Sequence, residues 1–315
     1  MRTLEIVHRT RYEYAEPVTL NDYRLMFRPR DSHDLRLLHT NLVIEPAATV
    51  RWIHDAFGNS IAIAAFASEP VRALELVSTI QVEHFAAPPE LPPIEEYARK
   101  LPFSYLAEEA PDLARYVERH YPDPNAMVSA WTRQFLEVEG DDAPDTATET
   151  FAVLVRMCQG IKDQLKYAMR FEAGTQPPAV TLESGGGTCR DYALLMMEGA
   201  RALGLAARFI NGYHYDPPLD VSDAEKALPA YPHAWMEAYL PGAGWMEFDP
   251  TNGIVGSDRL IRVAVARDPE QAMPIKGSFV GAPGVAINAI VDVSVRALDA
   301  AAKAPQEPAK AKPAA

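Results

Sequence analysis

Residues 1–85 carry alternating apolar and polar side chains. Near the start of the chain, positions of one parity are mostly apolar, and those of the other parity are mostly charged. The first row comprises Leu4, Ile6, His8, Thr10, Tyr12 and Tyr14, and the second comprises Glu5, Arg9, Arg11 and Glu13. The alternation returns over residues 74–83. A period of two is typical of a strand with one buried face, so we predict a small antiparallel β-sandwich.

A Pro-rich stretch at residues 87–94 separates this region from one with helical spacing. Proline cannot donate a hydrogen bond to a sheet and stiffens the chain, so we interpret the stretch as a linker. Apolar residues then recur every three or four positions. The predicted helices cover residues 111–119, 124–137, 151–165 and 189–203. Thr146 and Thr148 are candidate N-caps for the third helix, and Gly204 ends the fourth.

Strand character returns after the last predicted helix. We expect strands at residues 206–215, 234–240 and 245–248 and further strands within 261–298. Residues 299–315 are almost entirely Ala, Pro and Lys, a composition that buries too little surface to offset the entropy of ordering. The fold class is therefore α+β, with a sandwich domain over residues 1–86, a core domain over 95–298 and a disordered tail over 299–315.

The clean alternation in residues 1–86 predicts a domain with its own hydrophobic core. Because the linker is short and stiff, we expect this domain to dock in a fixed position on the rest of the protein. Large aromatic side chains are often partly buried at such contacts. Tyr12, Tyr14 and Trp52 are therefore the expected anchors.

The net charge of the chain bears on which macromolecules it can bind. The chain has 315 residues, with 30 basic and 43 acidic side chains, and a net charge of −13. A length near twice the usual domain size fits the two predicted domains. Binding to nucleic acid, or to an anionic membrane, requires a basic surface. We therefore expect neither partner.

Cysteine usage and the N-terminus suggest a cellular location. Two cysteines are too few for a disulfide framework, which suits a reducing compartment. The first residues lack the apolar segment of a signal peptide, and no run of about 18 apolar residues occurs. We therefore expect a cytoplasmic protein with no membrane partner.

Cys189 follows three consecutive glycines and begins a predicted helix. Glycines allow the backbone to turn sharply and to approach another group closely. The positive end of the helix dipole favours a thiolate over a thiol, and the free N–H groups of the first turn can hold an oxyanion. Cys189 is thus a candidate nucleophile, although a small buried cysteine at a helix start fits the same pattern.

Cys158 is a useful comparison, because it lies on the apolar stripe of the predicted helix at 151–165. No glycine loop and no basic neighbour accompany it. We therefore expect Cys158 to be a structural residue of the core.

His233 and Asp249 lie at the open end of a predicted hairpin whose turn is Pro241-Gly242-Ala243-Gly244. His233 stands near the start of the first strand and Asp249 near the end of its antiparallel partner, so the two ends meet. A carboxylate beside an imidazole fixes the tautomer of the ring and stabilises the imidazolium. Taken alone, His233 could be an ordinary surface histidine and Asp249 an aspartate that ends a strand. The predicted hairpin brings the two side chains to one place, which favours a functional pair.

The other histidines lack such neighbours. They are His8, His33, His39, His54, His84, His120 and His214, and His214, within a Tyr-His-Tyr strand, is expected to pack. No CxxC, HExxH, GxGxxG or acidic calcium loop occurs. We therefore predict neither a metal nor a cofactor.

Two segments and the N-terminal region carry a family resemblance. The segments GGGTCRDYALLMMEGARALGLAARFINGY and HAWMEAYLPGAGWMEFDPTNG resemble the bacterial transglutaminase-like family, which has a papain-like core. YEYAEPV, LMFRPR and DAFGN resemble the β-sandwich that precedes this core. The resemblance covers roughly residues 1–298. It implies Cys189 as nucleophile, His233 as base and Asp249 as the acid that orients it.

The resemblance implies a Cys-His-Asp enzyme that acts on amide bonds, either a Gln carboxamide or a peptide bond. The expected partner is a protein or peptide substrate, with an amine as an acyl acceptor in a transglutaminase-like reaction and water in a hydrolase. The backbone N–H of Cys189 is a candidate oxyanion donor, with Tyr167 as a second candidate. A cysteine protease or amidase, and a non-catalytic peptide-binding module, remain the alternatives.

Overall fold

The structure is a computed structural model, and it describes residues 2–85, 93–136, 149–168, 170, 174–215, 228–257 and 259–298. The predicted tail, most of the predicted linker, and the candidate caps Thr146 and Thr148 lie outside the described residues. No helix in the described ranges has the length and apolar character needed to cross a membrane.

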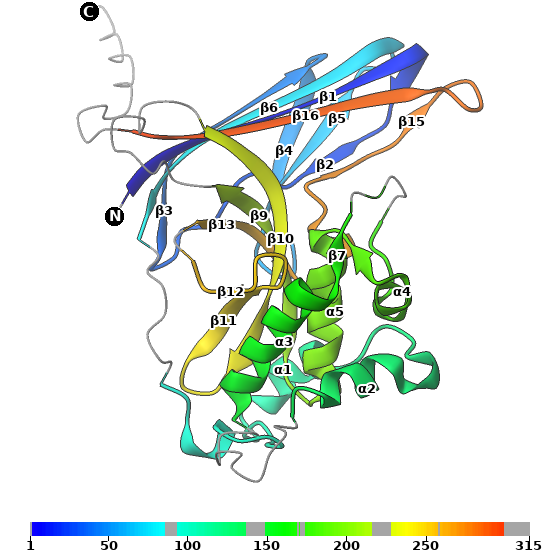
Figure 1. Cartoon of the computed structure of the whole chain (residues 1–315). Coiled ribbons are helices and arrows are strands. Elements are labelled where there is room, and N and C mark those ends of the chain that lie inside the picture. Colours follow the sequence, from blue (N-terminus) through cyan, green and yellow to red (C-terminus); the bar gives the residue numbers. More distant parts are fainter. Residues whose placement is uncertain are drawn as a thin grey trace, which may run out of the picture.

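Two antiparallel sheets form the N-terminal sandwich (Figure 1). The first contains β16 (Ile287–Ala297), β1 (Arg2–Leu20), β6 (Val71–His84) and β3 (Leu35–Glu45), in that spatial order. The second contains β14 (Ile275–Lys276), β2 (Tyr23–Leu25), β5 (Ser60–Phe66) and β4 (Ala48–His54). The short strand β15 (Phe279–Val280) pairs with the end of β1. Buried side chains of β6, such as Leu74 and Leu76, share an apolar cluster with Ala62 and Ala64 of β5.

The C-terminal strand β16 belongs to this sandwich, although the sequence analysis predicted residues 261–298 to be part of the core domain. It pairs with β1 from Leu4 to Tyr14. At its other edge, residues 294 and 295 pair with the start of β10 (Leu228–Leu240). This strand therefore joins the N-terminal sheet to the sheet of the core.

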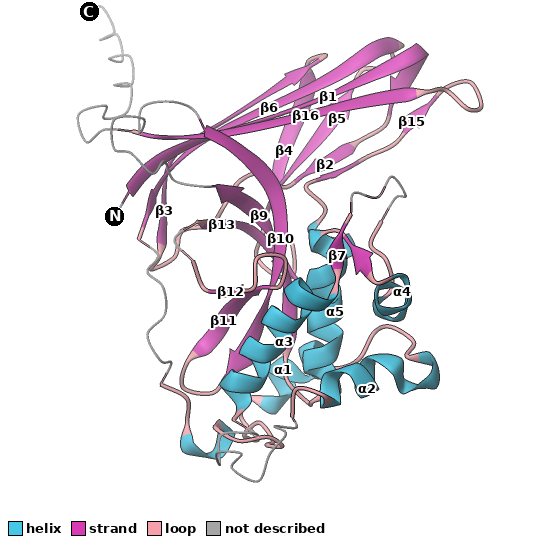
Figure 2. Cartoon of the chain, viewed as in Figure 1, coloured by secondary structure: helices cyan, strands magenta, loops and turns pink. Residues whose placement is uncertain are grey.

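The core contains an antiparallel sheet with helices on one face (Figure 2). Its strands are β12 (Ile254–Val255), β11 (Gly244–Asp249), β10, β9 (Ala207–Tyr215) and β13 (Leu260–Ala266), in that order. The helices are α1 (Ala110–Val117), α2 (Met127–Arg133), α3 (Thr150–Gln164), α4 (Pro178–Ser184) and α5 (Cys189–Ala202). Every residue of α5 from Asp191 to Arg201 is buried. The architecture confirms the predicted α+β class.

Two helices differ from the prediction for local reasons. The segment predicted as one helix over 124–137 begins with a 3-10 turn, Pro124–Ala126, and only then becomes α2. Asn125 and Ala126 have positive φ values, 58° and 52°, which interrupt the helix. The short helix α4 was not predicted, because its seven residues lie between prolines and the glycine loop and show too little periodicity.

The sandwich contacts the core through residues other than the expected anchors. Tyr12 and Tyr14 pack within the sandwich itself, and Trp52 is 49% exposed. Instead, Met26 and Ile61 belong to the main apolar cluster of the core. The anchor prediction was wrong, because aromatic size does not tell which of two nearby interfaces will bury a side chain.

Polar contacts fix the same interface. Asn59, only 2% exposed, donates to the backbone carbonyl of Val265 at 2.7 Å and accepts from its N–H at 3.0 Å. His8 Nδ1 lies 3.0 Å from the hydroxyl of Tyr213. Separating the sandwich from the core would break these buried hydrogen bonds, and Asn59 and His8 would keep only their contacts with Asp55 and Thr10 inside the sandwich.

Candidate active site

The glycine loop brings Cys189 to the first turn of α5. Gly185 ends α4 with a left-handed φ of 68°. Gly186 and Gly187 form β8, which pairs in parallel with β7 (Lys166–Tyr167). A Cβ at Gly186 would lie 2.4 Å from the carbonyl oxygen of Lys166, so only glycine allows this approach.

The first turn of α5 is held by Asp191. Its carboxylate accepts from the backbone N–H of Thr188 at 2.8 Å and from the Thr188 hydroxyl at 2.9 Å. This is a capping box, in which the residue before the helix and the third helical residue satisfy each other's backbone. The Thr-x-x-Asp spacing around Cys189 was visible in the sequence and would have identified Asp191 as an anchor of the loop.

Asp191 is completely buried and also binds outside the helix. Arg170 donates to it through Nε at 2.8 Å and Nη2 at 3.0 Å, and the backbone N–H of Gln176 donates at 2.7 Å. Burial acts to raise the pKa of this carboxyl, but the hydrogen bonds from Arg170 and the backbone hold the pKa below its usual value. The buried, charged carboxylate of Asp191 therefore links the glycine loop, α5 and the segment around Gln176 through its hydrogen bonds.

His233 of β10 and Asp249 of β11 lie together, as the hairpin predicted. His233 Nε2 is 2.8 Å from Asp249 Oδ2, and both side chains are buried. Asp249 also accepts from the side-chain amide of Asn252 at 2.7 Å and from the backbone N–H of Thr251 at 3.0 Å. Asn252, which the sequence analysis missed, follows Asp249 in the turn before β12 and helps to fix the carboxylate.

The Cys189 thiol lies close enough to the His233 ring for each group to shift the pKa of the other. Burial acts to raise the pKa of the thiol, but the hydrogen bond and charge of His233, with the Ala234 backbone and Arg190, lower it below its ordinary value. The structure thus brings together the three residues that the sequence singled out.

The charge state of His233 follows from the same contacts. Burial acts to lower the pKa of the imidazole, but the carboxylate of Asp249 and the contact with Cys189 raise it to about 10. The charge of His233 in turn keeps the pKa of Asp249 low against the effect of its burial. Each group therefore favours the charged form of the other, a thiolate beside an imidazolium.

Two rings enclose His233. The indole of Trp235 is fully buried and stacks on it, with ring centroids 5.9 Å apart and an interplanar angle of 27°. The His214 ring lies edge-on at 5.5 Å, which confirms the expected packing role. Gly212 makes room for the indole, since a Cβ there would lie 2.7 Å from Trp235 and 2.2 Å from the carbonyl oxygen of Ile261. Trp235 thus shields the His233–Asp249 pair from water on one side.

Tyr167 lies at the other side of the thiol. Its pairing partner in β8 is Gly187, two residues before Cys189, and the side chain is 49% exposed. The side chain and the backbone of Cys189 both shift the pKa of the Tyr167 hydroxyl, so the two residues are close neighbours. Burial and the Cys189 charge raise the pKa of Tyr167, so the hydroxyl keeps its proton. The second candidate oxyanion donor is thus in contact with the candidate nucleophile.

Cys158 behaves as the sequence comparison suggested. It is completely buried on α3, and its sulfur lies 3.5 Å from the carbonyl oxygen of Ile254. Burial, followed by the nearby charge of Asp249, raises the pKa of this thiol well above the ordinary range. The structural role predicted for Cys158 is confirmed by this environment.

Comparison with known proteins places the chain in a family. The family described as the bacterial transglutaminase-like N-terminal region matches residues 4–83, and the transglutaminase-like superfamily matches residues 139–250. Cys189, His233 and Asp249 all lie within the second match. The chain belongs to the bacterial transglutaminase-like family.

The relatives of this transglutaminase-like chain include mycobacterial proteins. An uncharacterized protein of Mycobacterium tuberculosis (strain ATCC 25618 / H37Rv) is 26% identical over 307 residues, spanning 92% of this chain and 90% of the relative. An uncharacterized protein of Mycobacterium leprae (strain TN) is 30% identical over 108 residues, spanning 34% of this chain and 37% of the relative.

A solved structure shares the fold of this transglutaminase-like chain over nearly its full length. It is the crystal structure of a candidate cysteine protease from Cytophaga hutchinsonii, with a TM-score of 0.70 and 18% sequence identity. The similarity covers 95% of this chain and 91% of the other. Both the sandwich and the core therefore recur together in one known architecture.

The thiolate–imidazolium pair predicts an unusual pH profile for alkylation. A free thiol with a pKa of about 8.5 loses reactivity roughly 80-fold between pH 8 and pH 6, because the thiolate is the nucleophile. Cys189 is expected to lose clearly less reactivity than that, because its lowered pKa keeps a larger share of the thiol ionised as the pH falls. The measurement is the iodoacetamide labelling rate of each cysteine by mass spectrometry.

Internal and mutational controls are available in the same chain. Cys158 is expected to stay unlabelled in the folded protein, because it is buried. His233→Ala should restore the steep profile of a free thiol at Cys189. A steep profile in the unmodified protein would contradict the ion-pair assignment.

Proposed function

We propose that this chain is a thiol-dependent amide acyltransferase or hydrolase that acts on a protein or peptide substrate. Cys189 is the nucleophile, His233 the general acid and base, and Asp249 the residue that orients His233. The observation that supports this is the contact of a thiol at a helix N-terminus with an imidazole that is itself 2.8 Å from a buried carboxylate.

In the acylation step, the Cys189 thiolate attacks the carbonyl carbon of the amide. The C–N bond then breaks as the imidazolium of His233 gives its proton to the leaving nitrogen, which departs as ammonia or an amine. The product is a thioester on Cys189 and a neutral His233. Asp249 stabilises the positive ring before this transfer and keeps its orientation after it.

In the second step, neutral His233 takes a proton from the incoming nucleophile, which attacks the thioester. The C–S bond breaks, and the thiolate–imidazolium pair is restored. Water as the nucleophile gives hydrolysis, and a primary amine gives a new amide. The same residues serve both outcomes, so hydrolase and transferase are two branches of one proposal.

Two groups are the candidate donors for the oxyanion of the tetrahedral intermediate. They are the backbone N–H of Cys189 and the hydroxyl of Tyr167, which is a close neighbour of Cys189. We propose that the substrate carbonyl oxygen accepts from this N–H, and that the Tyr167 hydroxyl then turns to donate its own proton to the oxyanion.

The test uses p-nitrophenyl acetate, a general acyl donor that requires no knowledge of the natural substrate. We expect one equivalent of nitrophenol to appear rapidly, together with an acetyl group on Cys189 that mass spectrometry can locate. Adding a primary amine should accelerate deacetylation if transfer is the favoured branch. The absence of acetyl-Cys189 in folded protein would reject the enzyme and favour a peptide-binding module.

A further inference from the structure

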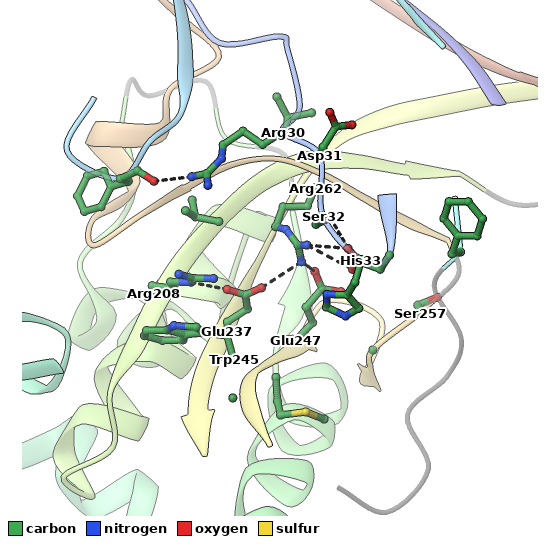
Figure 3. Close-up of a pocket in the computed structure, with 18 of the residues that line it drawn as sticks. Arg30, Asp31, Ser32, His33, Arg208, Glu237, Trp245, Glu247, Ser257 and Arg262 are labelled. Carbon is green, nitrogen blue, oxygen red and sulfur yellow. Dashed lines mark hydrogen bonds and ion pairs between the residues drawn. The ribbon is translucent and has the colours of Figure 1, made fainter. Parts of the chain in front are cut away.

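A cavity of about 760 Å³ lies between the sandwich and the core sheet, and none of the three candidate catalytic residues lines it (Figure 3). Its walls come from residues 30–34 ahead of β3, from the β10–β11 hairpin, and from β13. Pockets of this size at a domain interface commonly hold small ligands or single side chains. It is a second site, separate from the one around Cys189.

The charged side chains that line the cavity do not balance. Among the lining residues that the structure describes, four are acidic, and three are arginines. The acids are Asp31, Asp34, Glu237 and Glu247, and the arginines are Arg30, Arg208 and Arg262. Arg30 donates to the backbone carbonyl of Phe57 at 2.9 Å, away from the acids. The lining therefore carries an excess of one negative charge.

The guanidinium of Arg262 forms ion pairs with three of the four acids. Arg262 Nη1 lies 2.8 Å from Glu247 and 3.3 Å from Glu237, and its Nη2 lies 3.2 Å from Asp34. Glu237, which is 1% exposed, has a second partner in Arg208. Among the described residues, Glu247 has Arg262 as its one ion-pair partner. Figure 3 shows Glu237 and Glu247 converging on Arg262.

The shortage of positive charge is concentrated at Glu247. Glu237 and Glu247 stand directly opposite each other on β10 and β11, where like charges repel. Burial, followed by the charge of Glu237, raises the pKa of Glu247 to about 7 despite Arg262. A further cation beside Glu247 would relieve this repulsion.

The rest of the lining is apolar enough to hold an aliphatic chain. Phe57, Phe85, Trp245 and Met246 contribute to the walls. Arg208 lies over the Trp245 ring at 4.1 Å, which keeps the indole in place. Apolar walls that lead to a carboxylate suit a lysine side chain, whose methylene stem packs while its ammonium reaches the charge.

We propose that this cavity binds a lysine side chain of a peptide or protein ligand, with its ammonium group paired to Glu247. An arginine side chain of the ligand would fit the carboxylate end of the cavity less well. The guanidinium groups of Arg208 and Arg262 already occupy the positions in line with the carboxylates of Glu237 and Glu247. The proposal does not depend on the activity assigned to Cys189, so either can fail alone.

The test is calorimetric titration of the full chain with Nα-acetyl-lysine amide at pH 8.5, where the ammonium remains charged. We expect saturable binding that disappears with the Nα,Nε-diacetyl derivative, which lacks the charge. Glu247→Gln should weaken binding at least about tenfold, the loss of roughly 1.4 kcal/mol. Glu16→Gln, which removes an exposed charge on β1, is the matched control and should bind like the unmodified chain.

The pH dependence provides a second readout on the unmodified protein. The pKa of Glu247 is about 7, so its carboxylate becomes protonated as the pH falls below 6. Protonation removes the negative charge that would pair with the ammonium. The other charged or titratable groups that face Glu247 in the cavity are His33, Glu237, Asp34, Arg208 and Arg262. We therefore expect binding to be at least about fivefold weaker at pH 5.5 than at pH 8.5. Equal binding of both lysine derivatives, unchanged affinity at pH 5.5, or no saturable binding at pH 8.5 would overturn the proposal.

Discussion

Cys189→Ala is expected to lower the rate of ester or amide turnover by at least about 10⁴-fold, because no other group near His233 can form the thioester. His233→Ala should be nearly as damaging, since it removes the proton donor to the leaving group and the charge that ionises the thiol. Asp249→Asn should leave more activity than either, because the nucleophile and the imidazole both remain. The measurement is kcat/KM with p-nitrophenyl acetate for each variant.

Cys158→Ala is the matched control for these substitutions. It removes the other thiol of the chain from a buried position on α3, so the free energy of unfolding should fall while kcat/KM stays unchanged. Loss of turnover in a folded Cys158→Ala protein, or retained turnover in Cys189→Ala, would contradict the assignment of the nucleophile.

Asp191→Ala is expected to have the largest effect on stability, about 3–5 kcal/mol of the free energy of unfolding. The substitution leaves the guanidinium of Arg170 without its buried carboxylate and removes the acceptor for the Thr188 backbone N–H. Both losses fall on the loop that carries Cys189. The measurement is the midpoint and slope of urea unfolding.

Asp112→Ala is a suitable comparison for that experiment. Asp112 is also an acid in the first turn of a helix, α1, but it is exposed. Its loss removes only a dipole interaction, which is worth less than about 1 kcal/mol at an exposed position. Similar destabilisation by both substitutions would mean that the buried contacts of Asp191 contribute little.

The features that could be predicted from the sequence are those encoded by neighbouring residues. Alternation identified the strands of the sandwich, and three glycines before an apolar-periodic segment located the start of α5 at Cys189. The meeting of His233 and Asp249 followed from one short turn, because hairpin geometry needs no knowledge of distant segments. Local pattern was therefore sufficient for the three residues at the centre of the candidate site.

The features that were missed depend on residues far apart in the chain. The contacts of Asn59 with Val265 and of Asp34 with Arg262 join segments of the sandwich and the core that show no shared pattern. Each of these residues reads as an ordinary polar surface position on its own. Only the packing of the sandwich against the core makes them buried partners, so no local rule could have found them.

The pairing of β16 with β1 has a consequence for biosynthesis. About 200 residues separate the end of β6 from the start of β16, so at 5–20 residues per second roughly 10–40 s pass between their emergence from the ribosome. During that interval one edge of β1 has no neighbour to close it. The charges of Glu5, Arg9, Arg11 and Glu13 run along this strand and disfavour pairing with another nascent chain. The sandwich is thus completed only after the whole core between β6 and β16 has been made, although β1 precedes that core in the chain.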